Sequence, residues 1–355
     1  MPDPRMRLLI AVLFLLSACT ASASPSGSAD SSEPPSSPSI APSAAGSSLP
    51  ATAVEDAATL EVRLEGGPDW PTEAAGSLWV LAPDGPLRTG GSAPLIYRID
   101  PETGAEQARV EIPGRFCQGM DSGFDSIWAC VDDGMVRIDP ATNAIAAEIS
   151  YPSPQVYSRP AVTPDAIWAL SGAIAADSVV RIDPATNEVT DTLPLGRSGT
   201  NLAYGYDALW ATAMPSGILL RIDLTTHEVT EHVSGLPSPF IVTAGAGSLW
   251  VLLYGDRQAD SPGPDDPVVA RIDPDTAAVT LLGPTGRAPH EGDIFGDDFG
   301  VWVRGQDPFL ARIDTSTGQV DRIVTGSYAG GTLSGAFGSL WTTSTEFGRL
   351  WRFER

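Results

Sequence analysis

The stretch that decides the fold reads Gly-Ser-Leu-Trp-Val over residues 247–251, Val-Ala-Arg-Ile-Asp-Pro-Asp-Thr over 269–276 and Val-Thr-Leu-Leu-Gly over 279–283. The same pattern occurs seven times, with its tryptophan at Trp79, Trp128, Trp168, Trp210, Trp250, Trp302 and Trp341. An Arg-Ile-Asp follows the first six, at Arg98, Arg137, Arg181, Arg221, Arg271 and Arg312, and the seventh copy ends in Arg352-Phe353-Glu354. Successive tryptophans lie 49, 40, 42, 40, 52 and 39 residues apart. A repeat of this length is typical of solenoids and propellers.

Each copy contains four short runs that are rich in β-branched and aromatic residues and are separated by Gly and Pro. In the fifth copy these runs span 240–244, 248–252, 268–273 and 278–282. Four-stranded units repeated in this way match propeller blades, which protect their strand edges by radial repetition. The sequence therefore predicts an all-β fold, a seven-bladed β-propeller of four-stranded antiparallel blades. We expect the recurring tryptophans to be buried between adjacent blades. The recurring Arg could pair with a neighbouring blade or form a solvated ion pair.

The two ends of the chain predict how the ring closes. The last copy supplies three strands, at 331–336, 339–343 and 349–353, and the chain then ends. The missing fourth strand is available at 59–64, just before the first full copy. We therefore expect the N-terminal strand to complete the last blade and to remove an open edge.

The first 56 residues do not read as part of the propeller. Met6-Arg7 and the apolar run 8–16 form a signal peptide, because the run is too short to span a bilayer. The sequence Leu16-Ser17-Ala18-Cys19 resembles a bacterial lipobox, which implies cleavage before Cys19 and a lipid on that cysteine. An ordinary signal peptide that contains a cysteine is the alternative. We expect a signal peptide at 1–18, a lipid-anchored disordered Ser/Pro/Ala-rich tether at 19–56 and the propeller at 57–355.

These segments predict an exported protein that is lipid-anchored at the outer face of the bacterial cytoplasmic membrane, at the cell surface. The formal net charge is −23 at pH 7. Such an acidic chain argues against nucleic acid as a partner and against binding to anionic headgroups, so we expect membrane contact through the lipid anchor alone. We expect a monomer.

Two cysteines remain after the anchor. Cys117 and Cys130 flank a hairpin in the second copy. In an exported protein such a pair predicts a disulfide. The alternatives are a reduced pair and, with less support, a catalytic thiol.

Residues for ligand binding are expected on the face where the loops between blades and between second and third strands open, because long loops on a rigid scaffold commonly carry recognition. The loop between the second and third strands is long in blade 1 (82–94) and in blade 5 (254–267). Arginines recur where the chain enters the blades, at Arg115, Arg159, Arg197 and Arg287, and aromatic residues accompany them at Tyr157, Phe240 and Tyr328. Guanidinium groups suit carboxylate or phosphate, so these residues predict a site for an anionic ligand. Pairing of the arginines with nearby Asp is the alternative.

The motif Gly-Ser-Leu-Trp-Val … Arg-Ile-Asp-Pro-x-Thr-Gly-x-Val resembles the bacterial propellers of the streptogramin lyase (virginiamycin B lyase-like), YVTN and NHL-like group. The resemblance covers about residues 59–355 and implies the propeller fold. The lyase is a metal-dependent enzyme that opens a cyclic depsipeptide, with His and Glu around Mg²⁺. Here His227 and His232 map to the outermost strand of blade 4, and His290 with Glu291 is what remains of such a site.

The sequence therefore favours a binding protein without a cofactor over an enzyme. It would bind a protein, a peptide or glycan, or a small anionic molecule through its loop-rich channel face. The alternative is a metal-dependent lyase or hydrolase that uses His290 and Glu291 with Mg²⁺. The acidic loop 256–267 suggests Ca²⁺, but it lacks the register of a known calcium loop, so a solvated insertion is favoured.

Overall fold

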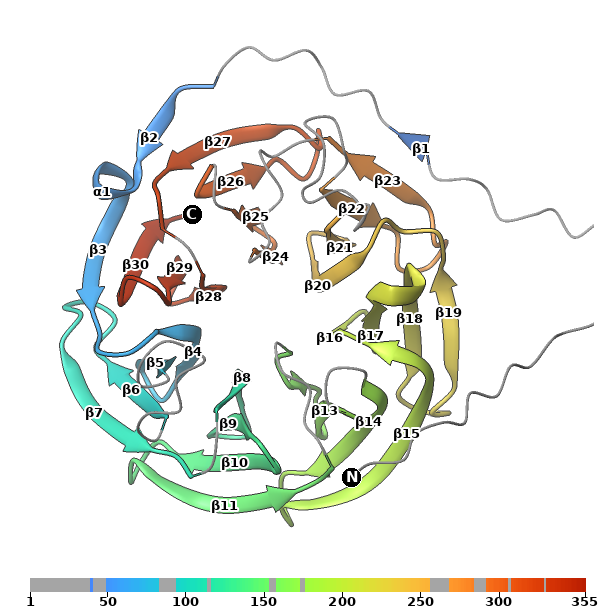
Figure 1. Cartoon of the computed structure of the whole chain (residues 1–355), viewed down its shortest axis with the longest axis horizontal. Helices are drawn as coiled ribbons and strands as arrows, with labels where there is room; N and C mark the ends of the chain where they lie inside the picture. Colours follow the sequence, from blue (N-terminus) through green and yellow to red (C-terminus); the bar gives the residue numbers. More distant parts are fainter. Residues whose placement is uncertain are drawn as a thin grey trace, which may run out of the picture. The chain divides into compact units, whose positions relative to one another are not determined.

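The computed structural model describes residues 39–40, 49–82, 94–113, 116–152, 158–172, 176–255, 268–283, 292–305, 308–328 and 330–355. The chain divides into two units, residues 1–37 and 38–355, and all the described residues belong to the second. This unit consists of seven antiparallel sheets arranged as blades around a central axis (Figure 1). The predicted all-β, seven-bladed propeller is confirmed.

In blades 1 to 6 the strands follow one another along the chain from the centre to the rim, and in blade 7 the rim strand is β3. Blade 1 consists of β4 (Asp69–Ala74), β5 (Ser77–Ala82), β6 (Leu95–Ile99) and β7 (Glu106–Glu111). Blade 2 consists of β8 (Phe116–Gly123), β9 (Ser126–Val131), β10 (Gly134–Asp139) and β11 (Ala144–Ser150). Blade 3 consists of β12 (Ala161–Val162), β13 (Ile167–Ser171), β14 (Ala176–Asp183) and β15 (Glu188–Gly199). Blades 4 and 5 are β16 (Asn201–Gly205), β17 (Ala208–Ala213), β18 (Ile218–Asp223), β19 (Val229–Val233); β20 (Pro239–Gly245), β21 (Ser248–Leu253), β22 (Val269–Ile272), β23 (Val279–Leu282). Blades 6 and 7 are β24 (Asp293–Asp297), β25 (Gly300–Arg304), β26 (Leu310–Ile313), β27 (Val320–Thr325); β28 (Leu333–Ala336), β29 (Ser339–Ser344), β30 (Arg349–Glu354), β3 (Ala58–Arg63). A 3₁₀ turn, η2 (Met214–Ser216), connects two strands of blade 4.

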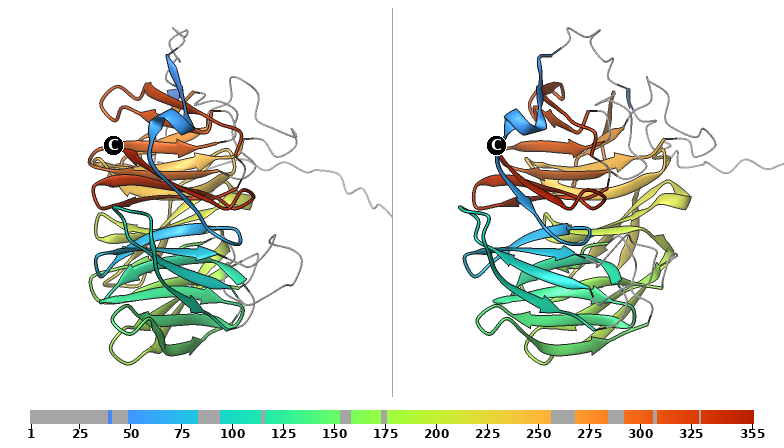
Figure 2. Two further views of the ribbon diagram at one scale, coloured as in Figure 1. Left: turned by 90° about the vertical axis from the view of Figure 1, so that its left-hand side faces the viewer. Right: turned by 60° about the vertical axis from the view of Figure 1, so that its left-hand side comes forward.

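The ring closes as the sequence predicts. β3 pairs antiparallel with β30, with Val62 opposite Leu350 and Glu61 opposite Trp351. Figures 1 and 2 show β3, in blue, beside β30, in red, so the two ends of the chain share one blade. Blade 7 is therefore held together by strands from opposite ends of the sequence.

Residues just before the expected start at 57 also belong to the folded unit. β2 (Ala51–Ala53) pairs parallel with the rim strand β27, and α1 (Val54–Ala57) leads from it into β3. Further towards the N-terminus, β1 (Ser39–Ile40) pairs parallel with the rim strand β23. A rim strand leaves one row of backbone amides and carbonyls unpaired, and these short segments use that edge. Among the described residues, no helix has the length and apolar character that a membrane span requires.

The seven recurring tryptophans are core residues, as expected. Each is at most 1 % exposed. Each packs against the blade that follows it: Trp79, for example, shares a cluster with Met120 and Ile127 of blade 2, and Trp341 shares one with Leu78 of blade 1. In five blades the indole N–H also donates to the carbonyl of the residue five positions earlier, as Trp250 does to Gly245 at 3.0 Å. The tryptophans thus join neighbouring blades along the whole ring.

Most of the recurring arginines also join blades. Arg98 donates to the carbonyl of Pro140 at 2.7 Å and to the side chain of Asn143 at 3.0 Å, both in the turn of the next blade. The next-blade contact recurs at Arg137, Arg271 and Arg352. Arg181, Arg221 and Arg312 instead pair with carboxylates of their own blades. Both alternatives raised by the sequence therefore occur, in different blades.

The close approach of blades explains one set of glycines and gives a prediction. A Cβ at Gly245 would lie 2.6 Å from the backbone carbonyl of Gly296 in the next blade, whereas a Cβ at Gly123 would lie 2.5 Å from a methyl of Val162, a side chain that can move. We expect Gly245→Ala to lower the free energy of unfolding by about 3 kcal/mol and Gly123→Ala by about 1 kcal/mol. Urea unfolding curves measure both, and equal losses would contradict the backbone-contact argument.

Candidate functional site

A cavity of about 250 Å³ lies where the inner parts of the blades meet, and all seven blades contribute to its wall. Its polar and aromatic lining residues include Trp70, Asp121, Arg159, Asn201, Tyr204 and Asp293. In each blade, one residue of the innermost strand pairs with the recurring tryptophan on the second strand. Most of these polar and aromatic residues lie two positions before that residue in the sequence. Across blades 1 to 7 this position holds Trp70, Gly119, Arg159, Asn201, Ile241, Asp293 and Thr332. The repeat therefore builds one layer of side chains around the axis.

Arg159 extends across this layer. It lies just before β12 in blade 3, but its Nη2 donates to the carbonyl of Leu333 in blade 7. Its guanidinium carbon lies 5.0 Å from the ring centroid of Trp70 in blade 1, a cation–π geometry. Within the described part of the chain, the Nε and Nη1 groups of Arg159 have no hydrogen-bond acceptor and no ion pair. The guanidinium is thus fixed at one nitrogen and keeps donors for another group.

Asp293 is fixed by the same residue of blade 7, Leu333. It is 3 % exposed, and its two carboxylate oxygens accept hydrogen bonds from the amides of Ile294 at 2.8 Å and Leu333 at 2.7 Å. Leu333 therefore donates its N–H to Asp293 and accepts from Arg159 at its carbonyl. Burial raises the pKa of Asp293, while the positive charge of Arg159 opposes the rise.

Asp121 reaches the cavity from blade 2. Its Oδ1 accepts hydrogen bonds from the Thr72 hydroxyl at 3.2 Å and the Ser122 amide at 2.8 Å. Its Oδ2 accepts none from the residues that the structure describes. The side chain of Asp121 is partly buried, desolvation raises its pKa, and the nearby Arg159 again opposes the rise. One oxygen of Asp121 is thus available to a bound molecule.

Further charged groups lie behind the wall. Asp69 is 3 % exposed and accepts hydrogen bonds from the Thr332 hydroxyl at 2.8 Å and the Trp70 amide at 3.1 Å. Burial raises the pKa of Asp69 to about 7, and the charge of Asp293 adds to the rise. Arg304 is fully buried and donates to the carbonyls of Tyr328 and Gly330. Trp70 itself has φ of 49°, a conformation rare for a bulky residue, which places its ring under Arg159.

Of the predicted ligand-binding residues, the structure places Arg159 in the cavity wall and the other described ones outside it. Arg197 pairs with Glu231 on the rim strand β19, and both side chains are nearly half exposed. Phe240 stacks on Tyr254 with ring centroids 4.3 Å apart. Tyr328 donates to Glu55 at 2.8 Å. Arg115, Tyr157 and Arg287 lie outside the described residues, so a funnel of four arginines stays a prediction.

The remaining predicted sites stay predictions. Cys19, His290 and Glu291 lie outside the described residues, as does the side chain of Cys117, so the disulfide with Cys130 is not tested. Cys130 is buried on β9. In the described part of the chain, no group of three or more His, Cys, Asp or Glu side chains could hold a metal ion.

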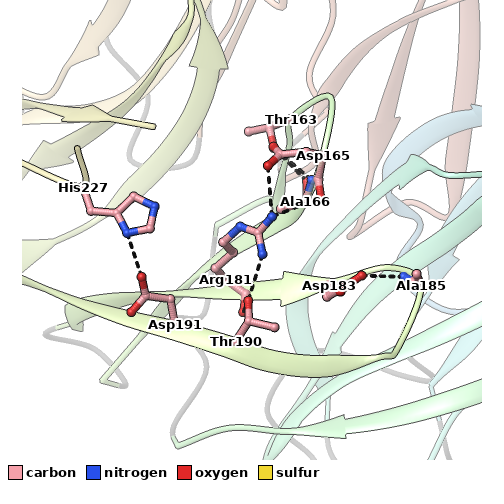
Figure 3. A network of polar contacts seen from close by, with 9 residues as sticks. All are labelled: Thr163, Asp165, Ala166, Arg181, Asp183, Ala185, Thr190, Asp191 and His227. Carbon is pink, nitrogen blue, oxygen red and sulfur yellow. Dashed lines mark hydrogen bonds and ion pairs between the residues drawn. The ribbon is translucent and has the colours of Figure 1, made fainter. Parts of the chain in front are cut away.

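Two histidines that the sequence places at the rim have structural contacts. His227 Nδ1 lies 2.7 Å from an oxygen of Asp191 on the neighbouring rim strand β15. Figure 3 shows this contact beside Arg181, which binds Asp165 and Thr190 of its own blade instead of reaching the next one. His232 packs edge-on against Trp210, and burial lowers its pKa. His232 Nε2 also lies 3.3 Å from the carbonyl of Asp273 in blade 5, so both histidines connect blade 4 with its neighbours.

Fold and site together define a seven-bladed propeller with a polar, charge-lined cavity at its centre. No protein-family model matches the chain, and no curated protein matches it. Among solved structures, virginiamycin B lyase from Staphylococcus aureus is similar with a TM-score of 0.62 and 18% identity, over 83% of this chain and 98% of that one. A streptogramin B lyase structure gives 0.61 and 18%, over 82% and 96%. BamB from Moraxella catarrhalis gives 0.54 and 12%, over 84% and 97%. At these identities the likeness shows the fold alone.

Proposed function

We propose that the protein is an exported, lipid-anchored propeller that binds a small polar ligand in its central cavity. The observation that carries this proposal is the placement of Arg159, Asp121 and Asp293 in the wall. Taking charged groups out of water lowers the stability of a fold unless they gain partners. In blade 5 the position equivalent to Arg159 and Asp293 holds Ile241, and the position equivalent to Asp121 holds Thr243. The fold can therefore be built without these charges, and a ligand gives a reason for them.

The N-terminal sequence supports the location. The apolar run 8–16 ends at the lipobox-like Leu16-Ser17-Ala18-Cys19, and the residues that follow are mostly Ser, Pro, Ala and Gly. A lipid on Cys19 would hold the propeller at the outer face of the membrane. The strand pairing supports the disulfide of an exported protein, because Phe116 lies opposite Val131 and so brings the backbone of Cys117 near that of Cys130.

The described geometry refines the expectation of an anionic ligand. Arg159 is available in the cavity, but two carboxylates lie beside it, and Arg197 is engaged elsewhere. We therefore favour a small polar molecule over a strongly anionic one. A protein partner and a lyase activity at His290 and Glu291 remain the alternatives.

Ligand binding is tested with a library of small acids, amines, amino acids and sugars, using the full chain in detergent and its melting temperature as the readout. We expect at least one compound to raise the melting temperature, and its Kd to rise about tenfold or more in Arg159→Gln, because a charge-assisted hydrogen bond is lost. Arg197→Gln is the matched control, since this arginine pairs with Glu231 at the rim. Equal binding by both variants, or no binding by any compound, would contradict the proposal.

A further inference from the structure

We infer that the cavity takes a small zwitterion, a free amino acid or a molecule of that size, with its carboxylate at Arg159 and Asn201 and its ammonium group at Asp121. The inference rests on the proposed function and names the class of ligand. The donors, the acceptor, the balance of charge and the size of the cavity each support it.

Two fixed donors form the end that would hold a carboxylate. Asn201 is 3 % exposed, and its Oδ1 accepts the amide of Val242 at 3.2 Å, which leaves its Nδ2 as the free donor. Among the described residues no acceptor faces this Nδ2. Arg159, in the neighbouring blade and at the same repeat position, keeps its Nε and Nη1 donors in the same way. Arg159 and Asn201 line the same cavity. A planar guanidinium and an amide donor both suit a carboxylate, which can accept several hydrogen bonds at once.

Asp121 supplies the acceptor for the ammonium group. Its Oδ1 is fixed by Thr72 and Ser122, and its Oδ2 keeps its acceptor capacity. A primary ammonium group brings three donors and a positive charge, so it satisfies this oxygen better than a neutral hydroxyl does. Tyr204 also contributes to the lining of the cavity.

The charges of the site argue for a ligand without net charge. Asp121 and Asp293 are matched by Arg159 in the wall and by Arg304 behind it, and below pH 7 Asp69 adds little charge because burial raises its pKa to about 7. A ligand with a net charge would leave one charge without compensation in a buried place, which is unfavourable. A zwitterion adds a negative group at Arg159 and a positive group at Asp121 and leaves the sum unchanged.

The size of the cavity limits the part of a ligand that it can hold. At about 30 Å³ for each water molecule, a cavity of 250 Å³ holds on the order of ten non-hydrogen atoms. A small amino acid fits this volume as a whole, whereas a peptide of several residues would have to extend out of it.

The inference is tested by isothermal titration of the full chain in detergent with alanine, serine and the other free amino acids. Each is compared with the same molecule without its amino group and with the amine without its carboxylate, for alanine propionate and ethylamine. We expect at least one amino acid to bind and both of its analogues to bind about tenfold more weakly or worse. An analogue that binds as tightly as its amino acid would overturn the inference.

Two variants assign the two ends. Asp121→Asn should remove the preference for the amino acid over the des-amino acid, whereas Arg159→Gln should remove the preference over the amine. Asp125→Asn, an exposed position in the same hairpin, is the control for the first variant, and Arg197→Gln for the second. Should Arg159→Gln fail to fold, Asn201→Asp serves instead, because it keeps the acceptor for Val242 and replaces the donor by a charge that repels a carboxylate. Preferences that survive Asp121→Asn would overturn the assignment.

The outcomes separate this inference from the proposed function. If no amino acid binds but another small molecule binds in an Arg159-dependent manner, the zwitterion is wrong and the binding function stands. If no molecule binds in a manner that depends on Arg159, both are wrong.

Discussion

A chain that begins at Glu65 loses its closed ring, and we expect its melting temperature to fall by about 10 °C or more relative to the full chain. The deletion removes β3, which completes blade 7 by pairing with β30. It uncovers Leu350 and Trp351, both fully buried, and removes the buried side chains of Val62 and Leu64. Each large apolar side chain returned to water costs about 1.5–3 kcal/mol, and for a domain of this size each kcal/mol corresponds to about 2–4 °C.

The matched control is a chain that begins at Leu49, which keeps β2, α1 and β3. We expect this chain to melt within about 2 °C of the full chain, because it loses only the residues before β2. Calorimetry or circular dichroism measures the melting temperatures of the full chain and of the two shortened chains. Should the shorter chain precipitate, a synthetic peptide of residues 57–65 added during refolding should restore soluble protein. Identical melting of both truncated chains would show that the ring does not need its N-terminal strand.

Asp69→Asn should stabilise the protein at alkaline pH and have little effect near pH 4.5. The pKa of Asp69 is raised from 3.8 to about 7 in the folded state. The folded protein therefore keeps this proton up to about pH 7, while the unfolded chain loses it near pH 4. Stability consequently falls as the pH rises through this window and stays lower above it. A shift of about three units corresponds to about 4 kcal/mol, which is the upper limit of the gain that we expect at pH 8.

The substitution preserves the local contacts, since an amide oxygen can accept the hydrogen bonds of Thr332 and Trp70. Asp293 and Asp121 also have raised pKa values, so part of the slope should remain in the variant. Unfolding in urea at pH 4.5, 6 and 8 measures the slope. Asp100→Asn is the control, because hydrogen bonds from Thr103 and Glu102 lower the pKa of Asp100, and its loss should leave the slope between pH 6 and 8 unchanged. If the free energy of unfolding changes with pH in the same way in Asp69→Asn and in the unaltered protein, the argument is refuted.

The architecture could be predicted because each blade is written in consecutive residues. Trp250 and Arg271 face each other in one hairpin of adjacent strands, and the same pairing recurs in the other blades. Counting strands also predicts the closure, since the last copy lacks one and the residues before the first copy supply it. Both conclusions need only local patterns that repeat.

The site could be predicted only in part, because its contacts connect residues far apart in the sequence. The place of Arg159 before an inner strand indicates its role, but its partner Leu333 is 174 residues away. Arg197, which the sequence places at a loop position equivalent to that of Arg159, does not line the cavity. This residue lies inside the long strand β15 rather than in an entry loop, so it extends to the rim strand of blade 4.

The acidic residues of the wall were missed, although a signal for them exists. When the seven copies are aligned on their tryptophans, Asp121 falls at a position that holds Ala161, Ala203 and Thr243 in other blades. A charged residue where every other copy has an uncharged one, Phe295 in blade 6 included, is a departure that the fold does not require. Comparison of the copies for such departures, rather than for their common motif, points to the axis of the ring.

In the proposed lipid-anchored form, the short parallel strands β1 and β2 would shorten the connection between the lipid and the propeller. A segment from Cys19 to residue 56 spans at most roughly 130 Å at about 3.5 Å per residue. With residues 39–40 and 51–53 paired with β23 and β27, only the segment from Cys19 to residue 38 would separate the lipid from the folded unit, and it spans at most roughly 70 Å. A lipid on Cys19 would then restrict the binding cavity to a thin layer next to the bilayer, where it would meet molecules released at the cell's own surface.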